Sequence, residues 1–195
     1  DLFGQLCDYK KIIEIAEKYN LLLIEDAAQS FGATYNNRKS CSFGNVSATS
    51  FFPAKPLGCY GDGGAIFTDD KKLAELCRSI RVHGMGKNKY DNIRIGMNSR
   101  LDTIQAAILL NKLSIFDSEI NLRNKNAEIY SKNLKENLIV PHVQKGNISS
   151  WAQYSLLSNS EEERNSLIEF LKKHKIPTAI YYKKPFHALD IYKHL

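Results

Sequence analysis

The first half of the chain alternates between helix-like and strand-like patterns of hydrophobic residues. Over residues 8–19, apolar side chains recur at helical spacing behind Asp8, a residue type suited to capping a helix. The solid apolar run at 21–24 follows and is closed by Glu25 and Asp26. Such a run after an amphipathic helix is typical of a strand buried on both faces of a parallel sheet. The pattern therefore predicts an α/β fold.

The remaining patterns extend this prediction along the chain. A polar, glycine-containing stretch at 81–98 predicts a long loop, and loops of this length in compact folds are usually functional or mobile. Beyond Pro141, a β-α-β pattern is typical of a second, smaller domain. We expect strands at residues 47–52, 65–68, 151–157 and 177–182, and helices at residues 70–80, 102–115, 116–134 and 160–174, the last opened by a capping box formed by Ser160 and Glu163.

Composition and charge narrow the function classes. The 27 Lys and Arg residues exceed the 21 Asp and Glu residues by six, but the lysines are scattered, so we expect no nucleic-acid partner. The apolar run at 21–24 is too short to span a membrane, and we expect a soluble, cytoplasmic protein. Four cysteines without a Cys-x-x-Cys pair and five dispersed histidines predict no metal site. The first residue, Asp1, suggests a fragment.

Lys55 and Asp26 are the residues whose settings favour chemistry. Lys55 lies among aromatic, proline and glycine residues, and an apolar, water-poor setting would free its amine to act as a nucleophile. A lysine with its charge at the surface is the alternative. Asp26 ends a buried strand and should face a cation, with a structural ion pair or cap as the alternative. A lysine that forms an imine and an aspartate that holds a pyridinium nitrogen suit pyridoxal phosphate.

Four sequence blocks occur in an order that resembles a known family. They read EDAAQSFGA at 25–33, SFFPAKPLG at 50–58, GDGGA at 61–65 and GMNSRLDTIQAA at 96–107. Together they resemble the DegT/DnrJ/EryC1/StrS nucleotide-sugar aminotransferases, a family of fold-type I enzymes that use pyridoxal 5'-phosphate. The resemblance implies that residues 1–115 are the remainder of the cofactor-binding large domain, built on a mostly parallel sheet. Residues 116–195 would form a linking helix and part of the smaller C-terminal α/β domain.

The resemblance assigns four residues to the cofactor. Lys55 would be linked to the cofactor aldehyde and would shuttle the proton during transfer. Asp26 would pair with the pyridine nitrogen and keep it protonated. Gln29 would contact the ring face or its 3-oxygen, and Ser50 would donate to the phosphate.

Four further residues are assigned to the partner subunit or the substrate. Asn98 would reach the cofactor phosphate of a neighbouring subunit in a homodimer, although it or Asp102 could instead cap the following helix. Arg100 would lie near the sugar nucleotide or its carboxylate, with a structural ion pair as the alternative. Tyr181 and Tyr182 would line the nucleotide end, or could be alternating residues of a strand.

The implied reaction is a ping-pong transfer of an amino group, with glutamate as the donor and a UDP- or dTDP-linked keto-sugar as the acceptor. It would serve surface polysaccharide or lipopolysaccharide synthesis. The residues at 40–41, 51–53 and 57–60 most resemble those of the enzymes that act on UDP-2-acetamido-2-deoxy-3-oxo-glucuronate. Lys55 argues against the family branch that has histidine there and dehydrates sugars. The alternative is a non-catalytic fragment that acts as a folding or interaction module, and we expect the 195 residues alone to be inactive.

Overall fold

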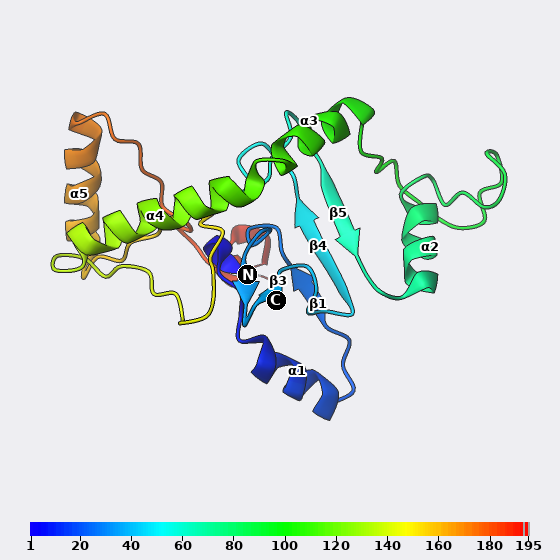
Figure 1. Cartoon of the computed structure of the whole chain (residues 1–195), viewed down its shortest axis with the longest axis horizontal. Helices are drawn as coiled ribbons and strands as arrows, with labels where there is room; N and C mark the ends of the chain where they lie inside the picture. The colour runs from blue at the N-terminus through cyan, green and yellow to red at the C-terminus, as the bar shows by residue number, and fades with distance from the viewer. Residues whose placement is uncertain (193, 195) are drawn as a thin grey trace. The chain divides into compact units, whose positions relative to one another are not determined.

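The computed structural model describes residues 1–192 and 194, which divide into two compact units (Figure 1). Unit 1 comprises Asp1–Tyr130 with His142–Tyr154, and unit 2 comprises Ser131–Pro141 and the chain from Ser155 onward. The division between the two units lies inside α4 (Phe116–Leu134). The physical reason is that Phe116 and Ile120, in the first turns of α4, are buried in the core of unit 1.

The central sheet of unit 1 has three strands in the order β1-β4-β5. The β1–β4 pairing is parallel and the β4–β5 pairing is antiparallel, so the described sheet is mixed. In its register, Asp26 lies opposite Ala48, which lies opposite Ile66. A separate hairpin pairs β2 with β3 around Asn36 and Asn37, both in the left-handed conformation that tight hairpin turns require. The strand bounds are β1 Ile24–Asp26, β2 Thr34–Tyr35, β3 Arg38–Lys39, β4 Val46–Ser50 and β5 Gly64–Phe67.

One face of this sheet is covered and the other is bare. Glu25, Ser47 and Thr49 are buried on the covered face, whereas Ile24 and Ile66 on the opposite face are 70% and 56% exposed. The expectation that the run 21–24 is buried on both faces is therefore wrong for this chain, in which β1 begins only at Ile24. The reason is that the two hydrophobic clusters of the core, described next, both pack on the covered face, one through Ala65 and the other through Leu23.

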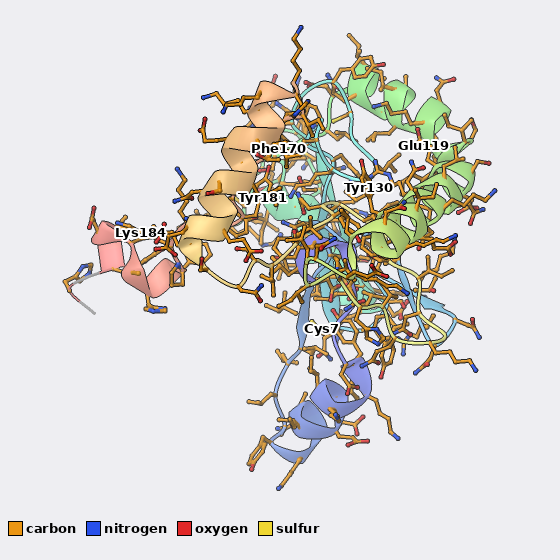
Figure 2. The ribbon with its side chains drawn as sticks, turned by 90° about the vertical axis from the view of Figure 1, so that its left-hand side faces the viewer. Cys7, Glu119, Tyr130, Phe170, Tyr181 and Lys184 are labelled. Carbon is orange, nitrogen blue, oxygen red and sulfur yellow. The ribbon has the colours of Figure 1, made fainter. Side chains whose placement is uncertain are left out.

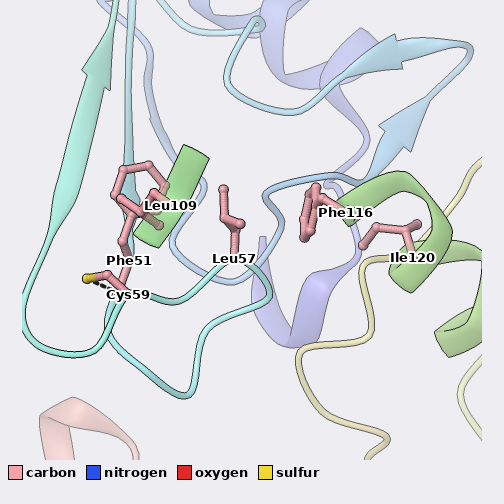
Figure 3. Close-up of a cluster of buried hydrophobic side chains, with 6 residues drawn as sticks. All are labelled: Phe51, Leu57, Cys59, Leu109, Phe116 and Ile120. Carbon is pink, nitrogen blue, oxygen red and sulfur yellow. Dashed lines mark hydrogen bonds between the residues drawn. The ribbon is translucent and has the colours of Figure 1, made fainter. Parts of the chain in front are cut away.

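Two hydrophobic clusters form the core of unit 1. The first joins the end of β4 and the loop after it to α3 and α4, through Phe51, Leu57, Cys59, Leu109, Phe116 and Ile120 (Figure 3). The second combines two residues near the start of the chain with two residues that flank the β2–β3 hairpin. Its members are Leu6, Tyr9, Ala33 and Phe43. Phe31 joins the first cluster to β5, because its ring contacts those of Phe51 and Phe67.

The helices predicted in unit 1 are confirmed. Asp8 caps α1 by accepting from the Lys11 amide, and Asp70 caps α2 by accepting from the Lys72 amide at 2.8 Å. In Figure 2, α1 extends away from the rest of unit 1 beyond the labelled Cys7. Within the described residues, no helix is both long enough and apolar enough to cross a membrane. The helices are α1 Tyr9–Lys18, α2 Lys71–Ile80, α3 Thr103–Leu113 and α4, with 3-10 segments at Leu2–Gly4, Phe186–Ala188 and Asp190–Tyr192.

Unit 2 contains α5 (Glu161–Lys173) but lacks the strands expected around it. The cap is confirmed, since Ser160 Oγ accepts from the Glu163 amide at 3.1 Å, while the Glu163 carboxylate accepts from the Asn159 amide. The strands expected at 151–157 and 177–182 are wrong. Over 151–157 the described pairing is a single bridge from Leu157 to Ile139, because the segment before it bonds to α4 instead. Residues 177–182 have no strand partner among the described residues.

Candidate active site

The site is assembled at one edge of the central sheet. Asp26 ends β1 and Ser50 ends β4, and because these strands are parallel their carboxyl ends lie at the same edge. The register places Asp26 opposite Ala48, two residues before Ser50, so Asp26 and Ser50 are on the same face. That face is the bare one. Open α/β sheets bind their ligands beyond the carboxyl ends of the strands, which makes this edge the candidate site.

Lys55 lies in the middle of a closed loop that begins directly after β4. The loop is closed at its base, because the Cys59 amide donates to the Phe51 carbonyl at 2.8 Å. Within the loop the Lys55 amide donates to the Phe52 carbonyl at 2.8 Å. The Lys112 ammonium group of α3 donates to the Gly58 carbonyl at 2.6 Å. Lys55 therefore lies on a loop that these hydrogen bonds hold in place and that returns to the same sheet edge.

The surroundings of Lys55 are more exposed to solvent than its sequence suggests. Phe52, Pro53 and Ala54 are exposed, and the buried part of the loop begins after Lys55, which is itself half-buried. The expected water-poor setting is therefore wrong for the described chain. The reason is that Phe51 turns into the core while Phe52, the next residue, faces the bare side of the sheet.

The two acidic residues at the end of β1 have opposite environments. Asp26 is exposed, which corrects the expectation that it is buried, and its carboxylate accepts from the Ala28 amide at 3.1 Å. No ion pair described in the structure involves it. Glu25 is the buried carboxylate, at 1% exposed. Successive strand residues point to opposite faces, so one of the two carboxylates had to be on the covered face, but the sequence does not show which.

Gln29 and Ser50 are both engaged by backbone groups. The Gln29 side-chain oxygen accepts from the Phe3 amide at 2.5 Å. The Gln29 backbone carbonyl accepts from the Ser150 hydroxyl at 2.7 Å. Ser50 Oγ accepts from the Phe52 amide at 3.2 Å, which leaves the hydroxyl hydrogen for a donor role. Ser150 is completely buried and holds Gln29 from a distant segment, a contact that no local pattern indicates.

Asn98 and Arg100 belong to a separate part of unit 1. Arg100 donates to the Asn98 side-chain oxygen at 3.0 Å, and both residues are exposed. Asn98 does not cap α3; Asp102 occupies the cap position, without a side-chain capping bond. None of the described hydrogen bonds joins this pair to Lys55 or Asp26. Arg100 lines a cavity of about 380 Å³ together with Val82, His83, Met85, Lys89, Tyr90 and Asn92.

Tyr181 and Tyr182 are in unit 2 and are described by themselves. Both are exposed, and their rings meet edge to face with centroids 5.4 Å apart. The alternative that they alternate along a strand is wrong, since no strand is described there. Among the described residues, no cluster of three or more His, Cys, Asp or Glu side chains could hold a metal ion.

Comparison with known proteins gives consistent matches over the whole chain. The model of the DegT/DnrJ/EryC1/StrS aminotransferase family matches residues 1–195. The UDP-2-acetamido-2-deoxy-3-oxo-D-glucuronate aminotransferase of Pseudomonas aeruginosa is 50% identical over 187 residues, which cover 95% of this chain and 51% of that protein. The dTDP-3-amino-3,6-dideoxy-alpha-D-galactopyranose transaminase of Aneurinibacillus thermoaerophilus is 41% identical over 192 residues, covering 98% and 52%.

A solved structure agrees in fold. The crystal structure of a DegT DnrJ EryC1 StrS aminotransferase from Brucella abortus superimposes with a TM-score of 0.95 at 52% identity, covering 100% of this chain and 51% of that one. The chain thus spans about half the length of the curated relatives it matches.

Proposed function

Because the chain belongs to the DegT/DnrJ/EryC1/StrS aminotransferase family, we propose that it carries the lysine-bearing part of an enzyme that uses pyridoxal phosphate. The observation that carries the proposal is the position of Lys55. It lies on a braced loop at the sheet edge where Asp26 and Ser50 share the bare face. These three side chains are the ones that the chemistry requires.

The residues present fit the cofactor. Pyridoxal phosphate supplies an aldehyde that an amine can join, a pyridine ring that takes up electrons, and a phosphate. Lys55 provides an amine, and Asp26 provides an exposed carboxylate that no described ion pair occupies. Ser50 provides a hydroxyl whose oxygen accepts one bond, so its hydrogen could be donated to the phosphate.

Each residue has a defined role in the proposed reaction. With the cofactor bound, the Lys55 amine would hold it at its aldehyde carbon and, when displaced by the amino donor, would be the group that moves the transferred proton. Asp26 would accept a hydrogen bond from the ring nitrogen and keep it protonated. Ser50 would donate to the phosphate, and Gln29 would contact the ring face or its 3-oxygen.

The proposed substrates are glutamate as amino donor and a nucleotide-linked keto-sugar as acceptor. The 50% identity to the enzyme named for UDP-2-acetamido-2-deoxy-3-oxo-D-glucuronate favours that sugar over a dTDP-linked one. Arg100 would then pair with the sugar carboxylate, and Tyr181 with Tyr182 would line the nucleotide. The product would enter surface polysaccharide synthesis in the cytoplasm.

The proposed assembly is a homodimer with shared sites. Asn98 would reach the phosphate held by the neighbouring subunit, which is consistent with the finding that none of the described hydrogen bonds joins it to Lys55 or Asp26. The supporting observation is that Asn98 and Arg100 are exposed and bonded to each other rather than to the candidate site of their own chain.

The test uses the longest form of the protein that contains this sequence. Glutamate is supplied with the UDP-linked 3-oxo-glucuronate or with a dTDP-linked 3-keto-sugar, and formation of 2-oxoglutarate and amino-sugar is followed by mass spectrometry. The proposal expects turnover with the UDP-linked sugar that Lys55→Ala abolishes. Turnover unaffected by Lys55→Ala would contradict it.

A non-catalytic folding or interaction module is the second candidate function. It is favoured by the bare sheet face, which leaves Ile24 and Ile66 open to contact with another surface. The two candidates differ in one outcome, because a module would show no lysine-dependent cofactor absorbance in any form of the protein.

A further inference from the structure

Glu25 is a buried carboxylate held by hydrogen bonds alone. Glutamate is almost never fully buried without a charged partner, yet Glu25 is 1% exposed and takes part in none of the described ion pairs. Its carboxylate accepts from the Cys41 amide at 2.6 Å, the Phe43 amide at 2.9 Å and the Ser47 hydroxyl at 2.7 Å. Three donors converge on one acceptor group.

This arrangement requires an acceptor at both side-chain oxygens of Glu25. One oxygen faces the Cys41 amide, and the other faces the Phe43 amide and the Ser47 hydroxyl. A carboxylate accepts on both oxygens, whereas a glutamine amide has one acceptor and one donor end. In either orientation, glutamine would set an N–H group against a backbone N–H group and leave a buried donor unsatisfied.

The three bonds tie β1 to the segment that leads into β4. Cys41 and Phe43 lie in the turn between β3 and β4, and Ser47 lies directly opposite Glu25 in the parallel register. β4 in turn runs into the Lys55 loop. On the covered face of the sheet, Glu25 therefore connects β1 and β4, the two strands whose ends carry the candidate site.

Asp26 is the next residue along β1 and lies on the other face. Successive side chains of a strand leave on opposite sides, so fixing one side chain fixes the direction of the next. The Asp26 carboxylate has one described bond of its own, to the Ala28 amide, whereas Glu25 has three. The backbone at Asp26 is paired with β4, and the three bonds of Glu25 add a second constraint directly before it.

We propose that Glu25 is a positioning residue, whose buried carboxylate holds the end of β1 so that Asp26 meets the cofactor ring nitrogen. The inference rests on the proposed function and deepens it. Glu25 acts through Asp26 and does not touch the cofactor.

The experiment compares Glu25→Gln, Ser47→Ala and Tyr9→Phe in the longest form of the protein. Tyr9→Phe is the matched control, because it removes one bond, from the Tyr9 hydroxyl to Asp1 at 2.9 Å, while keeping the ring stacked on Phe43. The readouts are affinity for pyridoxal phosphate and the visible circular dichroism of the bound cofactor, which reports the orientation of its ring. We expect Glu25→Gln to weaken binding about tenfold or more and to change the dichroic band. Ser47→Ala should give a smaller change in the same direction, and Tyr9→Phe should give none.

Several results would overturn the inference. Wild-type affinity and an unchanged band in Glu25→Gln would do so, as would equal losses in Tyr9→Phe, which would assign the effect to general destabilisation. If Glu25→Gln does not fold, Ser47→Ala decides, since an unchanged affinity and band there contradict the inference. Failure of the unsubstituted protein to bind pyridoxal phosphate is a distinct outcome, because it would overturn the proposed function itself and this inference with it.

Discussion

The Phe51 carbonyl accepts two hydrogen bonds from Cys59, one from its amide at 2.8 Å and one from its thiol at 2.9 Å. Phe51 and Cys59 also share the buried cluster drawn in Figure 3. The two ends of the Lys55 loop are therefore joined by backbone, side-chain and packing contacts at once. The position of Lys55 follows from this closure.

Gly58 tests how closely the Lys55 loop is packed. A Cβ atom at Gly58 would lie 2.5 Å from the Pro53 carbonyl oxygen and 2.8 Å from that of Phe52, and neither backbone atom can move aside without shifting the loop. We expect Gly58→Ala to lower the free energy of unfolding by about 1–3 kcal/mol, as overpacking does. Urea denaturation followed by fluorescence measures this change.

Gly61 provides the matched control for Gly58. A Cβ atom there would meet the flexible Gln105 side chain, at 3.2 Å, and no backbone atom within the same reach. Gly61→Ala should change the free energy of unfolding by less than about 0.5 kcal/mol. Equal urea midpoints for the two variants would show that the loop is not close-packed at Gly58.

Asp26→Asn removes the charge proposed to keep the ring nitrogen protonated. Because this charge favours the electron-accepting form of the ring, its loss should slow the half-reaction with glutamate by about 100-fold or more. Asp62→Asn is the control, since Asp62 is exposed in the glycine turn and bonds to no described group. Stopped-flow absorbance measures both rates. A rate for Asp26→Asn within twofold of wild type would remove Asp26 from its assigned role.

Cys41 should be unreactive near neutral pH. Burial first, and then the charge of Glu25, raise the pKa of the Cys41 thiol from its ordinary 9.0 to about 11. A raised pKa keeps the thiol protonated, so at pH 8 about one part in a thousand is the reactive thiolate. Alkylation with iodoacetamide and peptide mass spectrometry should show exposed Cys7 modified well before Cys41, with the Cys41 rate rising between pH 7 and pH 9. Equal labelling at pH 8 would contradict the burial of Cys41.

Ser160→Ala removes the side-chain cap of α5. The Glu163 amide then loses its acceptor, and we expect a loss of about 1 kcal/mol in the stability of this helix. Hydrogen exchange over α5 measures that loss. Ser166→Ala, at an exposed position on the same helix, should leave the exchange unchanged or slower. Faster exchange in both variants would point to a general loss of helix stability.

The helices could be predicted from the sequence because their signals are local. Asp8, Asp70 and Ser160 each accept from a backbone amide two or three residues later, and these bonds depend on nothing distant. The four motifs that carry the family resemblance are likewise read directly from the sequence. Lys55 and Asp26 could be chosen from their sequence contexts, and family resemblance assigned their roles.

The strands and burial were less predictable because they depend on distant partners. Residues 151–157 have a strand-like composition, but the Trp151 indole donates to Asn124 on α4 at 2.9 Å. Similarly, the run at 21–24 does not show which face of the sheet is covered. The sequence therefore did not predict that Glu25 is buried and Asp26 exposed. Both outcomes are set by contacts between segments far apart in sequence.

The most direct test of the account is to trap the proposed link between cofactor and lysine. The longest form of the protein is incubated with pyridoxal phosphate, reduced with borohydride, digested and sequenced by mass spectrometry. The account predicts the cofactor adduct on Lys55 and its loss in Lys55→Ala. An adduct on Lys112, which contacts the same loop at Gly58, or no specific adduct at all, would contradict it.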